Sequence, residues 1–286
     1  GPEYQQTMDR YDVVFKSPGI VLERPAEVYS CRILSQTEIF VRLFRDQIIG
    51  VTGTKGKSTT ATLLYHVLKA AGKKVLLVGN IGIPAFDHLA EIEEDTIIVF
   101  ELSCHQLEYL TVSPHMALLL NIHEEHLDHY QTMENYVRAK EQIFRHQKEG
   151  DLLICGGQCR PKPGSCAAKE IVVEERSHGN AALEVLSPEK DSSVFPDGTC
   201  IFFRRERYAI PVGEIRLLGQ HNYLDIAFVY TACRLHGVPG EALTRGLKTY
   251  QPLPHRLAFL GECGGVKYYD DSISTICETA IQALNT

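Results

Sequence analysis

The stretch Gly50–Thr60, GVTGTKGKSTT, decides the fold. It follows a short apolar run, Gln47–Val51, which is typical of a buried parallel strand. After it, residues 60–71 carry apolar side chains at helical spacing. A strand, a glycine loop and a helix in this order are the setting of a phosphate-binding loop, because the backbone N–H groups and the helix N-terminus point at one anion.

Residue types within this loop indicate nucleotide chemistry. Gly53 and Gly56 allow the backbone to turn, Lys57 is placed to reach the terminal phosphates, and the hydroxyl of Ser58 or Thr59 is a ligand for Mg²⁺. The spacing is G-x-x-G-K-S, shorter than the usual GxxxxGK[ST]. The alternative is a plain Gly/Thr turn before a helix, which would tolerate almost any residue at position 57.

Composition limits the function classes. The 286 residues suggest about two domains, and a net charge of −7 with both signs spread along the chain argues against nonspecific nucleic-acid binding. Nine scattered cysteines fit no common zinc spacing, so we expect free thiols and a reducing cytoplasm. No apolar stretch approaches about 18 residues, so no membrane span is expected. Gly1-Pro2 has the appearance of a protease-cleavage scar.

Apolar runs and helical patterns alternate between residues 36 and 150. Short runs at 74–79, 96–102, 116–122 and 151–156 are predicted strands, and 135–147 is a predicted helix. This alternation predicts an α/β fold with a mostly parallel, doubly wound sheet and functional loops at the carboxyl ends of its strands. Between 157 and 215, Pro and Gly separate short segments, including a hairpin turn at Phe195–Thr199, which predict a small antiparallel extension.

The two ends of the chain have a different character. Residues 11–15 form a predicted strand that leads into Ser17-Pro18-Gly19, a turn of the kind found at ligand-contacting strand ends. Helices are predicted at 222–236 and 240–250. Tyr250–Pro254 breaks the pattern as an interdomain linker, and a hairpin and a helix beginning near Thr275 follow. Neither end is long enough for a domain of its own, so each is predicted to be part of a larger domain.

Four features downstream of the loop converge on it if the sheet is parallel. Glu101 ends a predicted strand, where a carboxylate is suited to hold Mg²⁺. The segment 121–128, NIHEEHLD, is either a metal site or a polar loop that caps a helix. Lys140, on the predicted helix that follows, would by itself be a solvated lysine. Asn222 either contacts a nucleotide or caps the helix it opens.

These motifs together resemble the Mur ligase family. The segments GTKGKST, ELSCHQLE, NIHEEHLDHY with YVRAK, GQHN, LPHR and DDS occur in its order and spacing over essentially the whole chain. The resemblance implies three domains: a remnant of an N-terminal UDP-binding domain (1–36), a central ATP-binding domain (37–252) and the start of a C-terminal domain that delivers the amino acid (253–286). By this comparison the chain looks truncated at both ends, and the two flanking parts are expected to be partial Rossmann-like domains.

The resemblance also implies an activity. The block Glu101–Glu108 is most similar to that of the family member that joins D-glutamate to UDP-N-acetylmuramoyl-L-alanine, an ADP-forming reaction through an acyl phosphate. Such an enzyme works in the bacterial cytoplasm on peptidoglycan precursors, and thereby in cell-wall biogenesis, cell shape and cell division. It uses ATP and two Mg²⁺ ions, binds no nucleic acid, and is expected to be monomeric.

Roles for single residues follow from the same resemblance. Lys57, Glu101, His126 and Lys140 are expected to be catalytic. Lys140 is expected to be carbamylated, which would turn it into a ligand for Mg²⁺ together with Ser58, Glu101 and His126. ATP would contact Gly53, Thr54, Lys55, Gly56, Lys57, Ser58, Thr59, Asn222, Arg256 and Asp271. The acceptor substrate would contact Ser17, Pro18, Gly19, Asn80, Ser103 and Gln106.

Three positions depart from the family pattern. Ile273 stands where a lysine that holds the carboxylate of the amino acid is frequent, Asp225 where asparagine is common, and Lys55 where asparagine is common in the loop. The alternatives are therefore a related ligase that adds a different amino acid, and a nucleotide-binding module without ligase activity.

Overall fold

The computed structural model describes residues 3–81, 83–174, 184–186, 200–203, 208–211, 215–217, 221–272 and 277–284. The chain divides into two compact units. The first comprises Gly1–Lys57, Leu76–Leu153 and Gln158–Lys169, and the second comprises Ser58–Val75, Ile154–Gly157 and Glu170–Thr286. The positions predicted to form a hairpin turn at 195–199, and Gly1-Pro2 and Ile273, lie outside the described residues.

A seven-stranded sheet carries the glycine loop. Its strand order is β4-β5-β3-β6-β7-β8-β9. The strands are β3 (Ile48–Thr52), β4 (Val75–Gly79), β5 (Ile97–Glu101), β6 (Met116–Leu119), β7 (Leu152–Gly156), β8 (Lys169–Glu174) and β9 (Glu184–Leu186). The sheet is mostly parallel, and the antiparallel pairing of β8 with β9 is the predicted extension. The predicted fold class is therefore confirmed.

The centre of the sheet explains where the loop lies. β3 is buried along its whole length and pairs in parallel with β5 on one side and β6 on the other. The chain leaves β3 for β4 and β5, and then continues to β6 on the opposite side. Such a reversal of strand order opens a crevice at the carboxyl ends of the strands, and this is where α/β proteins bind ligands.

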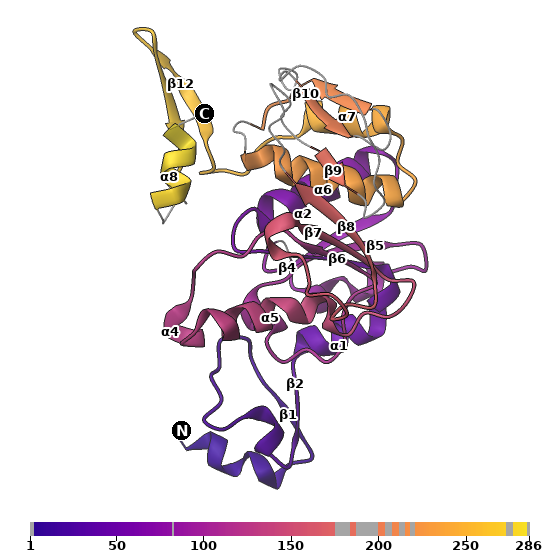
Figure 1. Cartoon of the computed structure of the whole chain (residues 1–286), viewed down its shortest axis with the longest axis vertical. Coiled ribbons are helices and arrows are strands. Elements are labelled where there is room, and N and C mark those ends of the chain that lie inside the picture. The colour runs from indigo at the N-terminus through magenta and orange to yellow at the C-terminus, as the bar shows by residue number, and fades with distance from the viewer. Residues whose placement is uncertain are drawn as a thin grey trace. The chain divides into compact units, whose positions relative to one another are not determined.

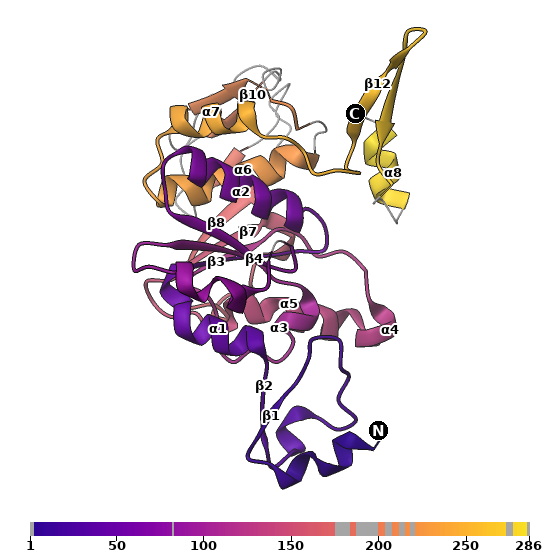
Figure 2. The ribbon, with the colours of Figure 1, turned by 180° about the vertical axis from the view of Figure 1, so that it is seen from behind.

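Helices of the first unit cover one face of these strands. Figures 1 and 2 show α1 (Gln36–Phe44), α3 (Cys104–Leu107) and α5 (Met133–Arg145) on the same side of the sheet. The helix α5 turns Tyr136, Ala139, Ile143 and Phe144 into the core. Ser35 is the N-cap residue of α1, and its Oγ accepts a hydrogen bond from the N–H of Glu38 at 3.0 Å.

The remaining elements of the first unit are short. They are the parallel pair β1 (Val13–Phe15) and β2 (Arg32–Leu34), helix α4 (Leu127–Tyr130), and the 3₁₀ turns η1 (Tyr4–Arg10), η2 (Ala26–Val28), η3 (Arg45–Gln47) and η4 (Ala85–Glu91). The 3₁₀ turn η5 (Gly157–Cys159) has residues in both units.

The second unit is built around three helices. α2 (Lys57–Ala70), α6 (His221–Leu235) and α7 (Gly240–Thr249) lie together in both ribbon views. Gly246 of α7 lies so close to Val67 of α2 that an added Cβ would be 3.1 Å from its methyl group. The unit also contains the antiparallel pairs β10 (Cys200–Phe203) with β11 (Tyr208–Pro211) and β12 (Ala258–Cys263) with β13 (Val266–Asp270), and helix α8 (Cys277–Leu284).

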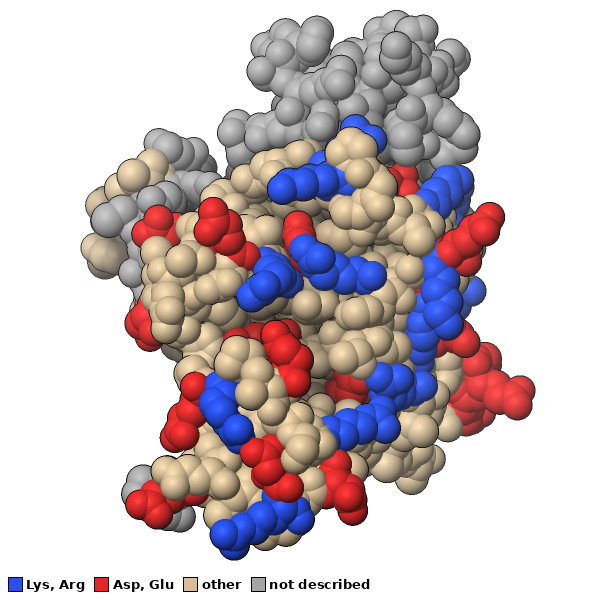
Figure 3. Space-filling model, turned by 60° about the horizontal axis from the view of Figure 1, so that its bottom comes forward, with Lys and Arg blue, Asp and Glu red and all other residues tan. Residues whose placement is uncertain are grey.

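Charges of both signs are interspersed on the surface. In Figure 3, blue and red side chains alternate over the described part of the face shown. None of the helices in the described ranges is both long and apolar enough to cross a membrane.

Candidate active site

The glycine loop follows β3 directly, and two of its glycines are required by geometry. A Cβ on Gly53 would lie 2.9 Å from the Cβ of Leu120, so only glycine allows this approach to the neighbouring strand end. Gly56 has a φ of 82°, in the left-handed region that other residues avoid. Helix α2 begins at Lys57, so Ser58 and Thr59 lie in its first turn.

Asn121 holds the loop in place, a role that the sequence did not reveal. Its Oδ1 accepts hydrogen bonds from the N–H groups of Thr54 and Lys55, at 3.1 and 2.9 Å, and its Nδ2 donates to the carbonyl of Lys55 at 3.0 Å. The hydroxyl of Thr54 is bonded in turn to that of Tyr136, 3.0 Å away. The strand end after β6 and helix α5 thereby fix the curvature of the loop.

Two lysines donate to the same loop carbonyl. The ammonium of Lys57 lies 3.0 Å from the oxygen of Gly53 and 2.8 Å from that of Thr54. The Nζ of Lys140, from α5, lies 2.7 Å from the same oxygen of Gly53. Lys140 is only 1% exposed, so the interpretation of it as a solvated lysine is wrong. Its spacing on the helix from Tyr136 and Ile143 places it on the buried face.

This crowding lowers the pKa of both amines. Burial, followed by the charge of Lys57, lowers the pKa of Lys140 from 10.5 to about 7. The pKa of Lys57 is also lowered, because burial outweighs the attraction of Glu101 and Glu125. The amines of Lys57 and Lys140 both lie at the carbonyl of Gly53, where they are largely shielded from solvent. A bound anion would stabilise their positive charges, so this environment favours anion binding.

Glu101 provides the negative group opposite these lysines. It ends β5, beside Val51 of β3, and it is fully buried. Its Oε1 accepts a hydrogen bond from the side chain of Asn80 at 3.0 Å, whereas its Oε2 has no hydrogen-bond partner. A buried carboxylate oxygen without a partner is costly, and a cation on it would remove that cost. Asn80 was expected to contact the substrate; in the structure its side chain orients the carboxylate of Glu101, a role that the sequence did not indicate.

The segment after β6 carries a second group of polar side chains. Lys55 forms an ion pair with Glu125, with 2.8 Å between Nζ and Oε1. Burial acts to raise the pKa of Glu125, but Lys55 and Lys57 outweigh it and hold that pKa below its ordinary value. His126 precedes α4 with a φ of 56°, a left-handed conformation for a residue with a Cβ, and its side chain is 44% exposed. Strain of this kind is concentrated at functional positions.

Ser103 and Gln106 bond to each other in the structure. The hydroxyl of Ser103 accepts from the N–H of Gln106 at 3.3 Å, and the side-chain oxygen of Gln106 accepts from the N–H of Ser103 at 2.9 Å. This is a capping box at the start of α3, a pattern that the spacing Ser-x-x-Gln makes readable from the sequence. The turn Ser17-Pro18-Gly19 is exposed after β1.

The other predicted ATP contacts belong to the second unit. Asn222 is buried in the first turn of α6, which begins at His221, so it is not the N-cap residue. Arg256 lies near Asp225 and lowers its pKa, although burial dominates and raises that pKa to about 7. The Oδ1 of Asp271 accepts from the N–H of Leu257 at 3.1 Å.

Comparison with solved structures identifies the fold. The chain is similar to the MurF ligase of Thermotoga maritima in complex with ADP, with a TM-score of 0.59, 19% identity, and coverage of 92% of this chain and 64% of that chain. It is also similar to the UDP-N-acetylmuramate-alanine ligase MurC of the same organism, with a TM-score of 0.56, 20% identity, and coverage of 96% and 65%.

Sequence comparison is more specific. The chain is 33% identical over 296 residues to a UDP-N-acetylmuramoylalanine--D-glutamate ligase of Leuconostoc mesenteroides, and 34% identical over 295 residues to one of Alkaliphilus metalliredigens. These alignments cover 100% and 99% of this chain but only 63% and 62% of the relatives. Residues 51–233 match the model of the Mur ligase middle domain. The chain therefore belongs to the Mur ligase family.

Proposed function

We propose that this protein, as a whole, is an ATP-dependent ligase that joins D-glutamate to UDP-N-acetylmuramoyl-L-alanine in peptidoglycan precursor synthesis, with release of ADP. The observation that carries the proposal is the convergence of Lys57 and Lys140 on the carbonyl of Gly53, together with the buried Glu101. Amines, loop N–H groups and one unpartnered carboxylate oxygen form a site for a phosphate chain and its metal ion.

Binding of ATP uses the glycine loop. Lys57 leaves the carbonyls of Gly53 and Thr54 for the γ-phosphate, while the loop N–H groups and the first turn of α2 receive the other phosphates. Transfer of the γ-phosphoryl group to the alanyl carboxylate gives an acyl phosphate, and the amine of D-glutamate then displaces phosphate. The protein contributes positioning and charge neutralisation to both steps.

Mg²⁺ fits the residues of this site. The partnerless Oε2 of Glu101 supplies a hard oxygen ligand, and the hydroxyl of Ser58 lies at the start of the neighbouring helix. His126, held in a left-handed conformation and exposed, is the proposed ligand for a second ion. The ions neutralise charge on the phosphates when bound.

Lys140 fits a metal site only after modification, because an ammonium group has no lone pair to donate. We propose that its neutral amine attacks CO₂, which forms an N–C bond and releases one proton, and that the resulting carbamate carries a negative charge. Its burial and the adjacent positive charge of Lys57 favour the neutral amine before this reaction, and the charge of Lys57 favours an anion after it.

The remaining roles extend this proposal to the substrates. Ser17, Pro18 and Gly19 contact the UDP diphosphate, Asn80, Ser103 and Gln106 lie toward the acceptor, and Asn222, Arg256 and Asp271 face ATP. The boundaries 1–36, 37–252 and 253–286 divide the chain into the corresponding parts. D-Glutamate is favoured by the block Glu101–Glu108 and is part of the names of the two sequence relatives. No disulfide bond joins the seven cysteines whose side chains the structure describes, which supports a location in the bacterial cytoplasm.

The test is ADP release by the full-length natural protein with ATP, Mg²⁺, UDP-N-acetylmuramoyl-L-alanine and D-glutamate. Release is expected to require both substrates and to fall at least a hundredfold in Lys57→Met. The matched control is Lys69→Met, which removes an exposed lysine from the same helix α2. A folded full-length protein that releases no ADP would refute the ligase, and release without either substrate would favour a nucleotide-binding module.

A further inference from the structure

Two short helices of the first unit carry metal-ligand side chains that the proposed function does not use. Helix α3 is followed by Glu108, three residues after His105, so both side chains lie on one face of the helix. His129 lies on α4. One ligand atom from each of these three side chains lies within 4.8 Å of the others. Ligand atoms around a tetrahedral Zn²⁺ are roughly 3.3 Å apart, so small side-chain rotations would complete such a site.

Contacts within this cluster are close. The Nε2 of His129 lies 3.1 Å from the Oε2 of Glu108, and the ring centroids of His105 and His129 are 4.4 Å apart. The side chain of His129 is only 11% exposed and that of Glu108 is 19% exposed. Two imidazoles and a carboxylate are thus brought together where little water competes for them.

Neighbouring groups support these side chains. The hydroxyl of Tyr130 lies 3.4 Å from the Nδ1 of His105, and the two rings are stacked. The ammonium of Lys16 lies over the ring of Tyr109, the residue that follows Glu108, at 4.6 Å from its centroid. Ligating histidines and carboxylates in metal sites are oriented by hydrogen bonds of this kind.

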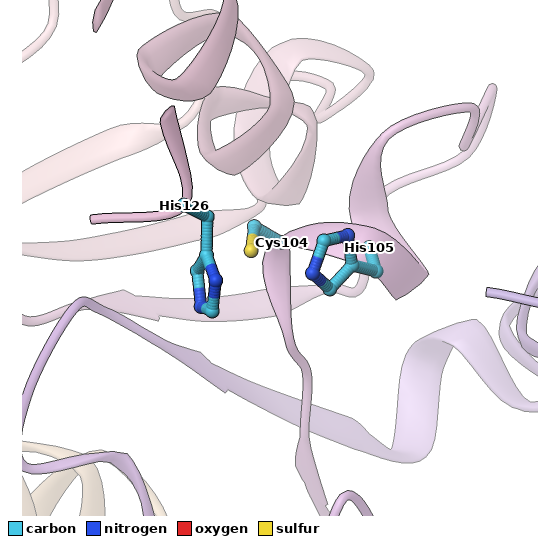
Figure 4. Close-up of side chains that lie close together, drawn as sticks. All are labelled: Cys104, His105 and His126. Atoms are coloured by element: carbon cyan, nitrogen blue, oxygen red, sulfur yellow. The ribbon is translucent and has the colours of Figure 1, made fainter. Parts of the chain in front are cut away.

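A competing set of ligands shares one member with the cluster. Cys104, His105 and His126 also have ligand atoms within 4.8 Å of one another, and Figure 4 shows the sulfur of Cys104 between the two imidazole rings. That set would use His126, which we assign to Mg²⁺ and whose side chain is 44% exposed. The set on His105, Glu108 and His129 leaves His126 free, and none of its members is as exposed as His126.

We propose that His105, Glu108 and His129 form a binding site for a divalent transition ion of the Zn²⁺ class, with water as the fourth ligand. Two nitrogen ligands and one carboxylate suit Zn²⁺ or Co²⁺, whereas Mg²⁺ prefers oxygen ligands. The site is separate from the glycine loop and does not depend on the proposed ligase activity.

The test is a titration of the 286-residue chain with Co²⁺ in excess Mg²⁺, followed by visible absorption. We expect one Co²⁺ per chain with the intense d–d bands of four-coordinate cobalt, no thiolate-to-cobalt charge-transfer band, and displacement by Zn²⁺. Glu108→Gln and His129→Ala are each expected to weaken Co²⁺ binding at least tenfold.

The matched control is His88→Ala. His88 and Glu91 form a similar pair, three residues apart and 2.8 Å between Nδ1 and Oε1, but no third ligand-type side chain joins them among the described residues. Co²⁺ affinity unchanged in a folded His129→Ala chain, or lowered as much by His88→Ala, would overturn the proposal. So would a charge-transfer band in the unmodified chain that disappears in Cys104→Ser, because the ion would then use the competing set. The presence or absence of a thiolate charge-transfer band in the unmodified chain distinguishes the two sets of ligands even if a variant fails to fold.

Discussion

The replacement of Lys140 by methionine tests the electrostatics of the site. Lys140 is buried and donates to the carbonyl of Gly53, and its pKa is lowered from 10.5 to about 7. Between these two pKa values the unfolded chain binds one more proton than the folded chain. Stability of the unmodified protein therefore rises with pH in this window, because stability increases with pH wherever the unfolded state holds more protons.

The magnitude follows from the two pKa values. Each pH unit in the window changes the free energy of unfolding by about 1.4 kcal/mol. From about pH 6 to about pH 9 the unmodified chain should gain about 2.5 kcal/mol relative to Lys140→Met. Methionine has a similar unbranched shape but no charge. Loss of the hydrogen bond to Gly53 therefore changes the stability difference between the unmodified chain and Lys140→Met by the same amount at every pH, and the pH dependence of that difference still reports the titration of Lys140.

The assay is urea denaturation followed by far-UV circular dichroism, because the chain has no tryptophan. Buffers must be free of CO₂, since carbamylation would consume the neutral amine. The exposed Lys148→Met is the control for the change of residue type. A difference between the unmodified chain and Lys140→Met that stays constant within about 0.5 kcal/mol over this range, or that changes in the opposite direction, would refute the reasoning.

Three further outcomes follow from the contacts. Burial raises the pKa of Asp225 from 3.8 to about 7, so between these values the folded state holds one more proton and stability falls as pH rises. Relative to the unmodified chain, Asp225→Asn should therefore gain about 2.5 kcal/mol of stability between about pH 5 and about pH 8 in urea denaturation. A difference in stability that does not change with pH would contradict the burial argument. Asn121→Ala removes three hydrogen bonds to the glycine loop and should weaken binding of ATP·Mg²⁺ by about tenfold in calorimetry, whereas equal affinity would show that the loop keeps its shape unaided. Ser35→Ala removes the N-cap of α1 and should cost about 1 kcal/mol of stability, with ATP affinity unchanged; a loss of affinity would indicate a wider role for this helix.

Much of the fold was predictable because the strands are buried in a parallel sheet. Ile97–Glu101 and Ile48–Thr52 are largely apolar runs that end in polar residues, and in the structure both are interior strands of the sheet, paired on both sides. Some ends differ by a few residues: the predicted strand at 116–122 ends at Leu119, because the backbone of Asn121 turns to bond the glycine loop. Apolar character alone does not locate such a turn.

Site residues differed in how well the sequence predicted them, because some are marked by a local pattern and others only by long-range contacts. Glycines and Lys57 stand out by residue type and spacing. The burial of Lys140 was readable only from its helical phase with Tyr136 and Ile143, since lysine is seldom buried. The contacts of Asn121 arise between segments 66 and 67 residues apart, so no local pattern indicates them.

Binding of ATP·Mg²⁺ to the 286-residue chain tests the central claim most directly. Isothermal titration calorimetry with a non-hydrolysable ATP analogue should show one site per chain, dependent on Mg²⁺. The affinity should fall at least tenfold in Lys57→Met and in Glu101→Gln, and it should be retained in Lys69→Met. No binding by the folded chain at millimolar analogue, or equal affinity in Lys57→Met, would contradict the assignment of Gly50–Thr60 as the nucleotide site.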